Sequence, residues 1–269
     1  MKAASFAYAR PGTLEEAFGL LLSADARVLA GGQSLIPSLN MRLASPQLLV
    51  DIGGITSLDR IELQGQSMRI GALVTHAQVE SAAEVRNHVP MLADAAAHIA
   101  HPAIRNRGTL GGSLALADPA AEYPACALAL DATLFIRGRA GERKVPVASF
   151  FKGLFETDLK TGEILVAAEF PTGGDSVFLE LARRQGDYAS VGLAAHRRNG
   201  ALRLAFFGVG DRPVLATHAA AEANTSIGAA QQALAKDLDP PADLYHSGAT
   251  KLHLARVLLA RALAQWNMK

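Results

Sequence analysis

The sequence predicts an α+β protein with two domains. Over the first 170 or so residues, short apolar runs typical of strands alternate with segments of helical periodicity. The stretch PTGGDS (171–176) interrupts this pattern with proline and glycine, so we place one domain over 1–173 and a second over 174–269. The second domain is expected to contain a small three-stranded antiparallel sheet followed by C-terminal helices.

Composition excludes several classes of protein. A formal net charge of +1 over 269 residues argues against a dedicated nucleic-acid binder. No run approaches the roughly 20 apolar residues of a membrane span, and the N-terminus lacks the apolar core of a secretory signal. We therefore expect a cytoplasmic protein. The single cysteine, Cys126, cannot form an internal disulfide, and one thiolate cannot hold an iron–sulfur cluster.

The beginning of the chain has a strand–helix–strand pattern. Thr13 with Glu16, three residues later, predicts a helix N-terminus of the capping-box type. The connections are short, which favours parallel pairing of the strands that flank each helix. The expected strands are 6–8, 26–30 and 47–52, and the expected helices are 13–22 and 35–39.

The remaining elements follow from the same signals. Thr75 with Gln78 repeats the capping-box spacing. Asn199-Gly200 between two apolar runs is a strong hairpin signal. The expected strands are 67–74, 132–138, 162–171, 177–184, 190–198 and 201–210, and the expected helices are 89–100, 123–130 and parts of the chain from 214 to the end.

Two glycine-rich stretches, LAGGQSLIP (29–37) and GTLGGSLALADPAAEYP (108–124), carry the functional signal. A glycine pair lets the backbone adopt positive φ and come close to a ligand, and its N–H groups suit a phosphate. Neither stretch matches the P-loop or the G-x-G-x-x-G pattern, and neither has a neighbouring lysine. These loops fit a tightly held dinucleotide better than a nucleotide that turns over. The alternative is that both are plain turns.

LAGGQSLIPSLNMRL together with IRNRGTLGGSLALADPAAEYP resembles the two flavin-binding motifs of molybdenum hydroxylase flavoprotein subunits. This family includes the medium subunit of aerobic carbon monoxide dehydrogenase and the FAD-binding part of xanthine dehydrogenase. The resemblance covers nearly the whole chain, including GEILVAAEFP and RRQGDYASVGLAA. It implies a two-subdomain, PCMH-type (vanillyl-alcohol-oxidase-like) FAD-binding domain, followed by a C-terminal domain of the carbon monoxide dehydrogenase flavoprotein type.

The resemblance also implies non-covalent FAD, with the pyrophosphate between the two glycine motifs. Glu122 stands where the family usually has an aspartate and would bond a ribose or ribityl hydroxyl, with Asp118 as the local alternative. Leu165 would pack near the isoalloxazine, and Tyr188 would lie against or beside that ring. No residue is assigned a catalytic or metal-binding role. The implied FAD-binding residues are Ala30, Gly31, Gly32, Gln33, Ser34, Leu35, Thr109, Gly111, Gly112, Ser113, Asp118, Glu122, Leu165 and Tyr188.

As a family member, the chain would pass electrons through FAD within a larger complex. A small 2Fe–2S subunit and a large molybdopterin subunit would be its partners, as a dimer of heterotrimers, with NAD, oxygen or a quinone as acceptor. The substrate stays open among carbon monoxide, purines, nicotinate-like heterocycles and aldehydes. Two alternatives remain, namely a stand-alone flavin oxidase or dehydrogenase and a non-redox nucleotide-binding module.

Other polar residues give weaker signals. His98 and His101 could share a helix face, but no third ligand has a matching spacing, so we expect no metal site. Arg105 and Arg107 are expected to anchor their loop through backbone carbonyls rather than to contact a cofactor.

Overall fold

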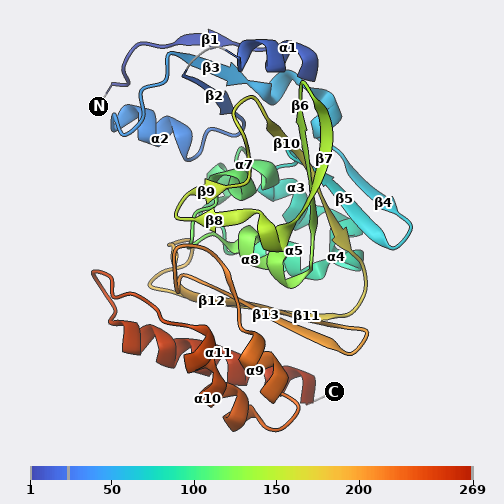
Figure 1. The fold of residues 1–269 in the computed structure, drawn as a ribbon, viewed down its shortest axis with the longest axis vertical. Coiled ribbons are helices and arrows are strands. Elements are labelled where there is room, and N and C mark those ends of the chain that lie inside the picture. The colour runs from blue at the N-terminus through green and yellow to red at the C-terminus, as the bar shows by residue number, and fades with distance from the viewer. Residues whose placement is uncertain (1, 23–24, 268–269) are drawn as a thin grey trace.

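The computed structural model describes residues 2–22 and 25–267, arranged as three layers along the longest axis (Figure 1). A small sheet forms one end, a larger sheet with its helices forms the middle, and a third sheet with the C-terminal helices forms the other end. Positions 268–269, where helix was expected to continue, lie outside the described residues.

The first layer is a parallel three-stranded sheet of order β1-β3-β2, as the short connections predicted. The Thr13 hydroxyl accepts from the Glu16 N–H at 3.2 Å and so caps α1. The Glu16 carboxylate accepts from the Gly12 N–H rather than that of Thr13, so the box is not reciprocal. The elements are β1 (Ala7–Ala9), α1 (Leu14–Leu20), β2 (Ala26–Leu29), α2 (Leu35–Asn40) and β3 (Leu48–Asp51).

The second layer is an antiparallel sheet of order β4-β5-β10-β6-β7. Its central strand β10 is buried along most of its length and separates two hydrophobic cores. Leu165 packs into the larger core with the helices, whereas Val166 packs toward the first layer. The strands are β4 (Ile61–Gln64), β5 (Ser67–Gly71), β6 (Thr133–Gly138), β7 (Gly141–Pro146) and β10 (Ile164–Pro171), and β8 (Phe151–Gly153) pairs separately with β9 (Glu156–Thr157).

Short helices accompany this sheet. The Thr75–Gln78 capping box is fully formed at the start of α3. The helix expected over 89–100 is shorter, because the chain turns after Ala96 and Ala100 adopts a φ of 43°. The helices are α3 (His76–Ser81), α4 (Ala83–His88), α5 (Pro90–Ala96), α6 (Pro102–Arg105), α7 (Leu110–Leu116) and α8 (Glu122–Ala129).

The third layer is an antiparallel sheet of order β11-β12-β13-β14. Three of these strands were expected, and the two-residue β14 extends the sheet by a fourth. Asn199 (φ 51°) and Gly200 (φ 78°) form the expected hairpin turn. The elements are β11 (Asp175–Ala182), β12 (Ala189–Arg198), β13 (Ala201–Phe207), β14 (Val214–Leu215), α9 (Thr217–Glu222), α10 (Ile227–Asp237) and α11 (Gly248–Asn267).

Both faces of the third sheet are covered. Because successive side chains of a strand point to opposite faces, Phe206 packs toward α9–α11 while Phe207 joins the core of the middle layer. Phe178 on β11 stacks on Phe207 with ring centroids 5.8 Å apart. The larger core therefore continues from the middle layer into the third.

Candidate functional site

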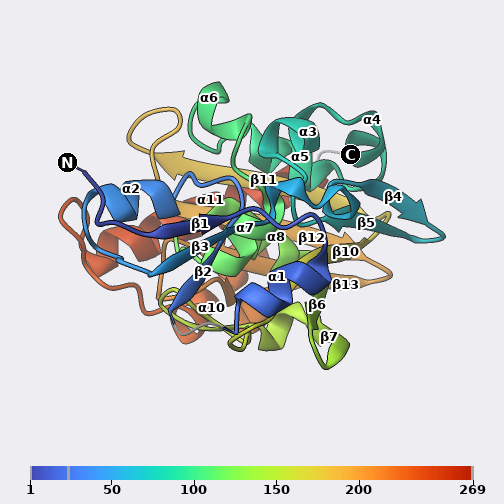
Figure 2. The ribbon, with the colours of Figure 1, turned by 90° about the horizontal axis from the view of Figure 1, so that it is seen from above.

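The two glycine motifs meet in the fold. A Cβ on Gly31 would lie 2.0 Å from the Arg107 carbonyl oxygen and 2.9 Å from the Gly108 Cα. A Cβ on Gly112 would lie 4.0 Å from the Ala30 Cβ. At Gly31 only glycine permits such close backbone approach, whereas the distance at Gly112 is an ordinary contact. Segments about 80 positions apart in the chain thus lie in contact, and α7 lies beneath the strands of the first layer in Figure 2.

The first motif is a turn that presents unused backbone donors. Gly32 has a φ of 75°, which favours glycine. Within the described part of the chain, the N–H groups of Gly32, Gln33 and Ser34 meet no acceptor. The Gln33 amide donates to the Gly31 carbonyl at 3.0 Å and closes the turn. Successive free N–H groups in such a turn form a concavity suited to an anion.

The second motif has a different construction. Its glycine pair was expected in a loop, but Gly111 and Gly112 lie in the first turn of α7. The Leu110 and Gly111 N–H groups donate to the Val74 and Ala72 carbonyls, and that of Gly112 donates to the Thr109 hydroxyl at 3.0 Å. These backbone donors are therefore already used, which corrects the expectation that the N–H groups of this glycine pair are free for a phosphate. The hydroxyls of Thr109 and Ser113 are the remaining polar groups of this segment.

Gly111 is required by packing rather than by a ligand. A Cβ at this position would lie 2.4 Å from the Ala72 Cβ. At Gly112 the tight contact is with the Thr109 hydroxyl, at 2.9 Å, and not with backbone. The two glycines of the pair therefore have separate functions: Gly111 lets α7 pack against the end of β5, and Gly112 leaves space beside the first motif.

Two carboxylates follow α7. Asp118 accepts from the Ala120 N–H at 2.9 Å and so stabilises the turn. Glu122 opens α8 and is only 9% exposed. Burial raises its pKa to about 7, opposed by a hydrogen bond from its own backbone and reinforced by the charge of Asp118. Only one oxygen of Asp118 is used by the turn, so both carboxylates remain candidates to bond a ligand hydroxyl.

Leu165 and Tyr188 differ sharply in burial. Leu165 is 4% exposed, at a bulge in β10 opposite Ile136. Tyr188 is 73% exposed, immediately before β12. The pKa of its phenol is raised, first by desolvation and then by the charges of Asp118 and Glu122.

The chain matches the known family of flavin-binding domains in molybdenum enzymes. Residues 4–173 match the family described as the FAD binding domain in molybdopterin dehydrogenase. Residues 176–266 match the carbon monoxide dehydrogenase flavoprotein C-terminal domain. The chain belongs to the FAD-binding subunits of molybdenum hydroxylases.

Relatives and solved structures support this assignment over the full length. The flavoprotein subunit is 37% identical to the 6-hydroxypseudooxynicotine dehydrogenase complex subunit alpha of Paenarthrobacter nicotinovorans, covering 98% of this chain and 95% of that protein. It superposes with a TM-score of 0.93 on quinoline 2-oxidoreductase of Pseudomonas putida 86, at 38% identity. The TM-score is also 0.93, at 34% identity, for carbon monoxide dehydrogenase of Hydrogenophaga pseudoflava. Both superpositions cover 98% of each chain.

In the second motif of the flavoprotein subunit, Arg105 has the expected anchoring function. Its Nη1 donates to the Ile99 and Ala100 carbonyls at 3.1 and 3.2 Å, and its Nε lies 2.8 Å from a Glu80 carboxylate oxygen. Arg107 acts through its backbone, since its carbonyl packs on Gly31.

Sequence reasoning missed two residues of the site. His76 is 6% exposed, and its backbone N–H donates to the Gly108 carbonyl. A Cβ at Gly108 would lie 2.6 Å from the Nε2 atom of the His76 ring. Ala72 supplies the surface on which Gly111 packs. His76 follows a capping threonine, but no spacing in the sequence links it to position 108. Glycine at 108 and 111 was the available signal that a backbone approaches closely.

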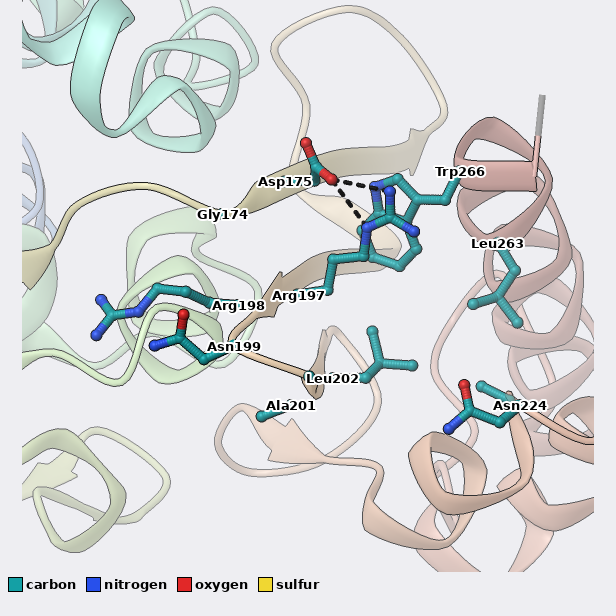
Figure 3. A pocket seen from close by; sticks show the side chains of 12 residues that line it. Gly174, Asp175, Arg197, Arg198, Asn199, Ala201, Leu202, Asn224, Leu263 and Trp266 are labelled. Carbon is teal, nitrogen blue, oxygen red and sulfur yellow. Dashed lines mark hydrogen bonds and ion pairs between the residues drawn. The ribbon is translucent and has the colours of Figure 1, made fainter. Parts of the chain in front are cut away.

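Two further features bear on ligand binding. A cavity at the hairpin end of the third sheet has the Arg197 guanidinium paired with Asp175 and lying 5.1 Å from the Trp266 ring (Figure 3). The Arg197 and Asp175 charges are thus already paired, and the cavity is far along the chain from the glycine motifs. Among the described residues, no group of three or more His, Cys, Asp and Glu side chains could hold a metal ion. Nor does any described helix have the length and apolar character to cross a membrane.

Proposed function

We propose that the surface where the glycine motifs meet holds FAD, with the pyrophosphate between them. The observation that carries this proposal is the contact of Gly31 with the Arg107–Gly108 backbone, which joins both motifs into one cradle. The N–H groups of the first motif have no acceptor within the described part of the chain, and successive free N–H groups of this kind suit an anion. The Thr109 and Ser113 hydroxyls then bond phosphate oxygens from the second motif.

The remaining members of the set have positions consistent with the rest of FAD. Ala30 and Leu35 flank the first turn, Glu122 bonds a ribose or ribityl hydroxyl, and Leu165 and Tyr188 border the isoalloxazine. When bound, FAD supplies the redox chemistry, and this chain binds and orients the cofactor. We assign no residue here a proton-transfer or substrate-oxidation role.

We propose that the electrons come from other chains. The sequence has one cysteine, and Cys126 is buried within the core, so this chain cannot ligate an iron–sulfur cluster. A small 2Fe–2S subunit and a large molybdopterin subunit are therefore the proposed partners, in a dimer of heterotrimers, with NAD, oxygen or a quinone as acceptor. The purified subunit alone is expected to hydroxylate none of the family's substrates.

We divide the chain into a FAD-binding domain over 1–173 and a C-terminal domain over 174–269. The two family matches, at 4–173 and 176–266, support this division. So do the positive φ values of Gly173 and Gly174, 79° and 85°, at the link between β10 and β11.

The test is a visible absorption spectrum after FAD is added and excess is removed by desalting. The wild-type chain, or its complex with co-expressed partners, should keep a flavin spectrum. Gly112→Leu should lose it, because the new side chain projects between the motifs after a small shift of Thr109. Gly228→Leu is the matched control, since Gly228 also lies in the first turn of a capped helix but is exposed. A wild-type complex without flavin would refute the proposal.

A further inference from the structure

The loop between β11 and β12, residues 183–188, is fixed on a distant part of the chain. The Gln185 side-chain amide donates to the Ala97 carbonyl at 3.3 Å. Gly186 has a φ of 82°, and a Cβ there would lie 2.7 Å from the Ala100 carbonyl oxygen. The loop is visible beside α6 in Figure 2. It therefore rests on the turn between α5 and α6 through backbone contact that requires glycine.

The surface beneath the loop is itself held firmly. Ala100 has a φ of 43°, which is unusual for a residue with a side chain. Arg105 binds the carbonyls of Ile99 and Ala100 and is paired with Glu80 on α3. Residues 97–100 are thus a fixed platform, and the loop above them is placed by it.

At its other end the loop leads to the candidate flavin site. Tyr188 directly precedes β12, and the first carbonyls of β12, at Ala189 and Ser190, pack on Gly208. Gly208 in turn donates its N–H to the Pro119 carbonyl at 2.9 Å. Pro119 lies between Asp118 and Glu122. The Tyr188 backbone is therefore placed between the platform at 97–100 and the 118–122 segment.

We propose that Gly186 and Gln185 are positioning residues, which dock the 183–188 loop on the Ala97–Ala100 turn and thereby hold the Tyr188 ring at the bound flavin. This inference rests on the proposed function, because it takes FAD to occupy the cradle. Neither residue touches the cofactor; each acts through Tyr188. A side chain on Gly186 lifts the loop from its platform and releases the ring.

Limited proteolysis tests the docking without any cofactor. Arg184 is exposed in the loop, so trypsin cleavage there produces a 1–184 fragment that mass spectrometry identifies. Gly186→Ala should raise the cleavage rate about fivefold, equivalent to about 1 kcal/mol of local opening. Gly200→Ala is the control, because Gly200 has a similar φ of 78° but no atom within 4 Å of the added Cβ. Gln185→Ala should give a smaller increase and keeps the test valid if Gly186→Ala fails to fold.

Flavin fluorescence tests the consequence for the ring. In the complex with co-expressed partners, Tyr188→Leu should raise the fluorescence of bound FAD, since an adjacent phenol quenches it. Gly186→Ala should raise it as well and weaken FAD binding about tenfold, whereas Gly200→Ala should match wild type.

The outcomes separate the two claims. If wild type binds FAD but Gly186→Ala matches Gly200→Ala in cleavage, quenching and affinity, the positioning role is refuted and the proposed function stands. If the wild-type complex binds no FAD, the proposed function fails, and the role of the loop at the flavin fails with it, whatever the cleavage rates.

Discussion

At the scale of single residues, the glycines of the two motifs are not equivalent. A Cβ added to Gly31 or Gly111 would lie only 2.0 or 2.4 Å from the nearest atom of another segment. Gly32 and Gly112, by contrast, face the space between the motifs or their own turn. The pairs look alike in sequence. In each pair the first glycine allows close packing, and the second shapes the surface that we propose faces FAD.

Gly111→Ala should lower the free energy of unfolding by about 2 kcal/mol, because overpacking against Ala72 forces a backbone shift. Urea denaturation measures the change. Gly228→Ala, at an exposed position in the first turn of α10, should be neutral or slightly stabilising. Equal stability of both variants would contradict the close packing described for α7.

Glu180 gives a pH-dependent prediction. Its side chain is 2% exposed, and the His98 imidazole lies 3.8 Å away, but burial lowers the pKa of His98 and so disfavours its charged form. Burial, and then the charge of Glu122, raises the pKa of Glu180 from 4.5 to about 8. Between about pH 5 and pH 8 the folded protein keeps a proton that the unfolded chain has released, so stability falls as the pH rises through this window.

Glu180→Gln should reduce that fall by about 2 kcal/mol, because it keeps the shape of the side chain and removes the titration. Urea midpoints at pH 5, 6, 7 and 8 measure it. Glu142→Gln, an exposed carboxylate on β7, is the control and should leave the pH profile as in wild type. An unchanged profile for Glu180→Gln would show that this carboxyl is ionised in the folded protein.

At the scale of elements, strong patterns predicted the structure well. The parallel pairing of β1–β3, the Asn199-Gly200 hairpin and the capping box before α3 each follow from local chemistry that tertiary contacts do not override. The elements β4, α4, α6, α7, β9 and β14 were missed. Each has seven residues or fewer, too few to show a period, and is fixed by its neighbours instead.

The sequence indicated which two segments form the candidate site, but not the contacts that they make. The sequences of the two glycine motifs indicated a dinucleotide, and the fold brings both motifs together. The first N–H groups of α7 donate to the Val74 and Ala72 carbonyls, in the turn after β5 about 40 positions earlier, and no local pattern reveals this pairing. The same holds for Tyr188, whose loop is placed by the turn at 97–100.

Arg143 joins β7 to the segment that leads into β10. Its guanidinium binds Glu163 through Nε and Nη2 at 2.8 and 2.6 Å, and Asp158 through Nη1 at 2.6 Å. These hydrogen bonds lower the pKa of both carboxyls. The stability they contribute is present at neutral pH and is lost as the pH falls through the lowered values.

Arg143→Met should therefore lower stability by about 1–2 kcal/mol at pH 7, with a smaller difference near pH 3. Thermal unfolding at both pH values measures this. Arg143→Lys should recover only part of the loss, because lysine cannot make the planar two-point contact. A difference from wild type that is as large at pH 3 as at pH 7 would refute the ionic origin.

At the scale of the whole molecule, the larger hydrophobic core extends across the domain boundary that we place between residues 173 and 174. Phe178, Ala194 and Phe207 from the third sheet belong to the same core cluster as α5 and α8. Arg203 on β13 also binds the Leu128 carbonyl at 2.8 Å and Asp131 at 3.0 Å. The C-terminal sheet thus completes the core of the preceding layer.

A fragment of residues 1–173 should accordingly lack a cooperative thermal transition, because the apolar faces of α5 and α8 are exposed without the third sheet. Circular dichroism melting and binding of a hydrophobic dye measure this, with the full chain as the reference. A fragment that melts cooperatively and binds no dye would show that the first two layers are sufficient for folding.

The different construction of the two glycine motifs affects which substitutions the family can accumulate. In the first motif the N–H groups free to meet the proposed FAD belong to the backbone, so side chains there can vary as long as the turn at Gly32 keeps its shape. In the second motif the backbone N–H groups already bond within the protein, so the proposed binding would depend on the identity of Thr109 and Ser113. Divergence that preserves binding should therefore be limited by conformation at one motif and by chemistry at the other.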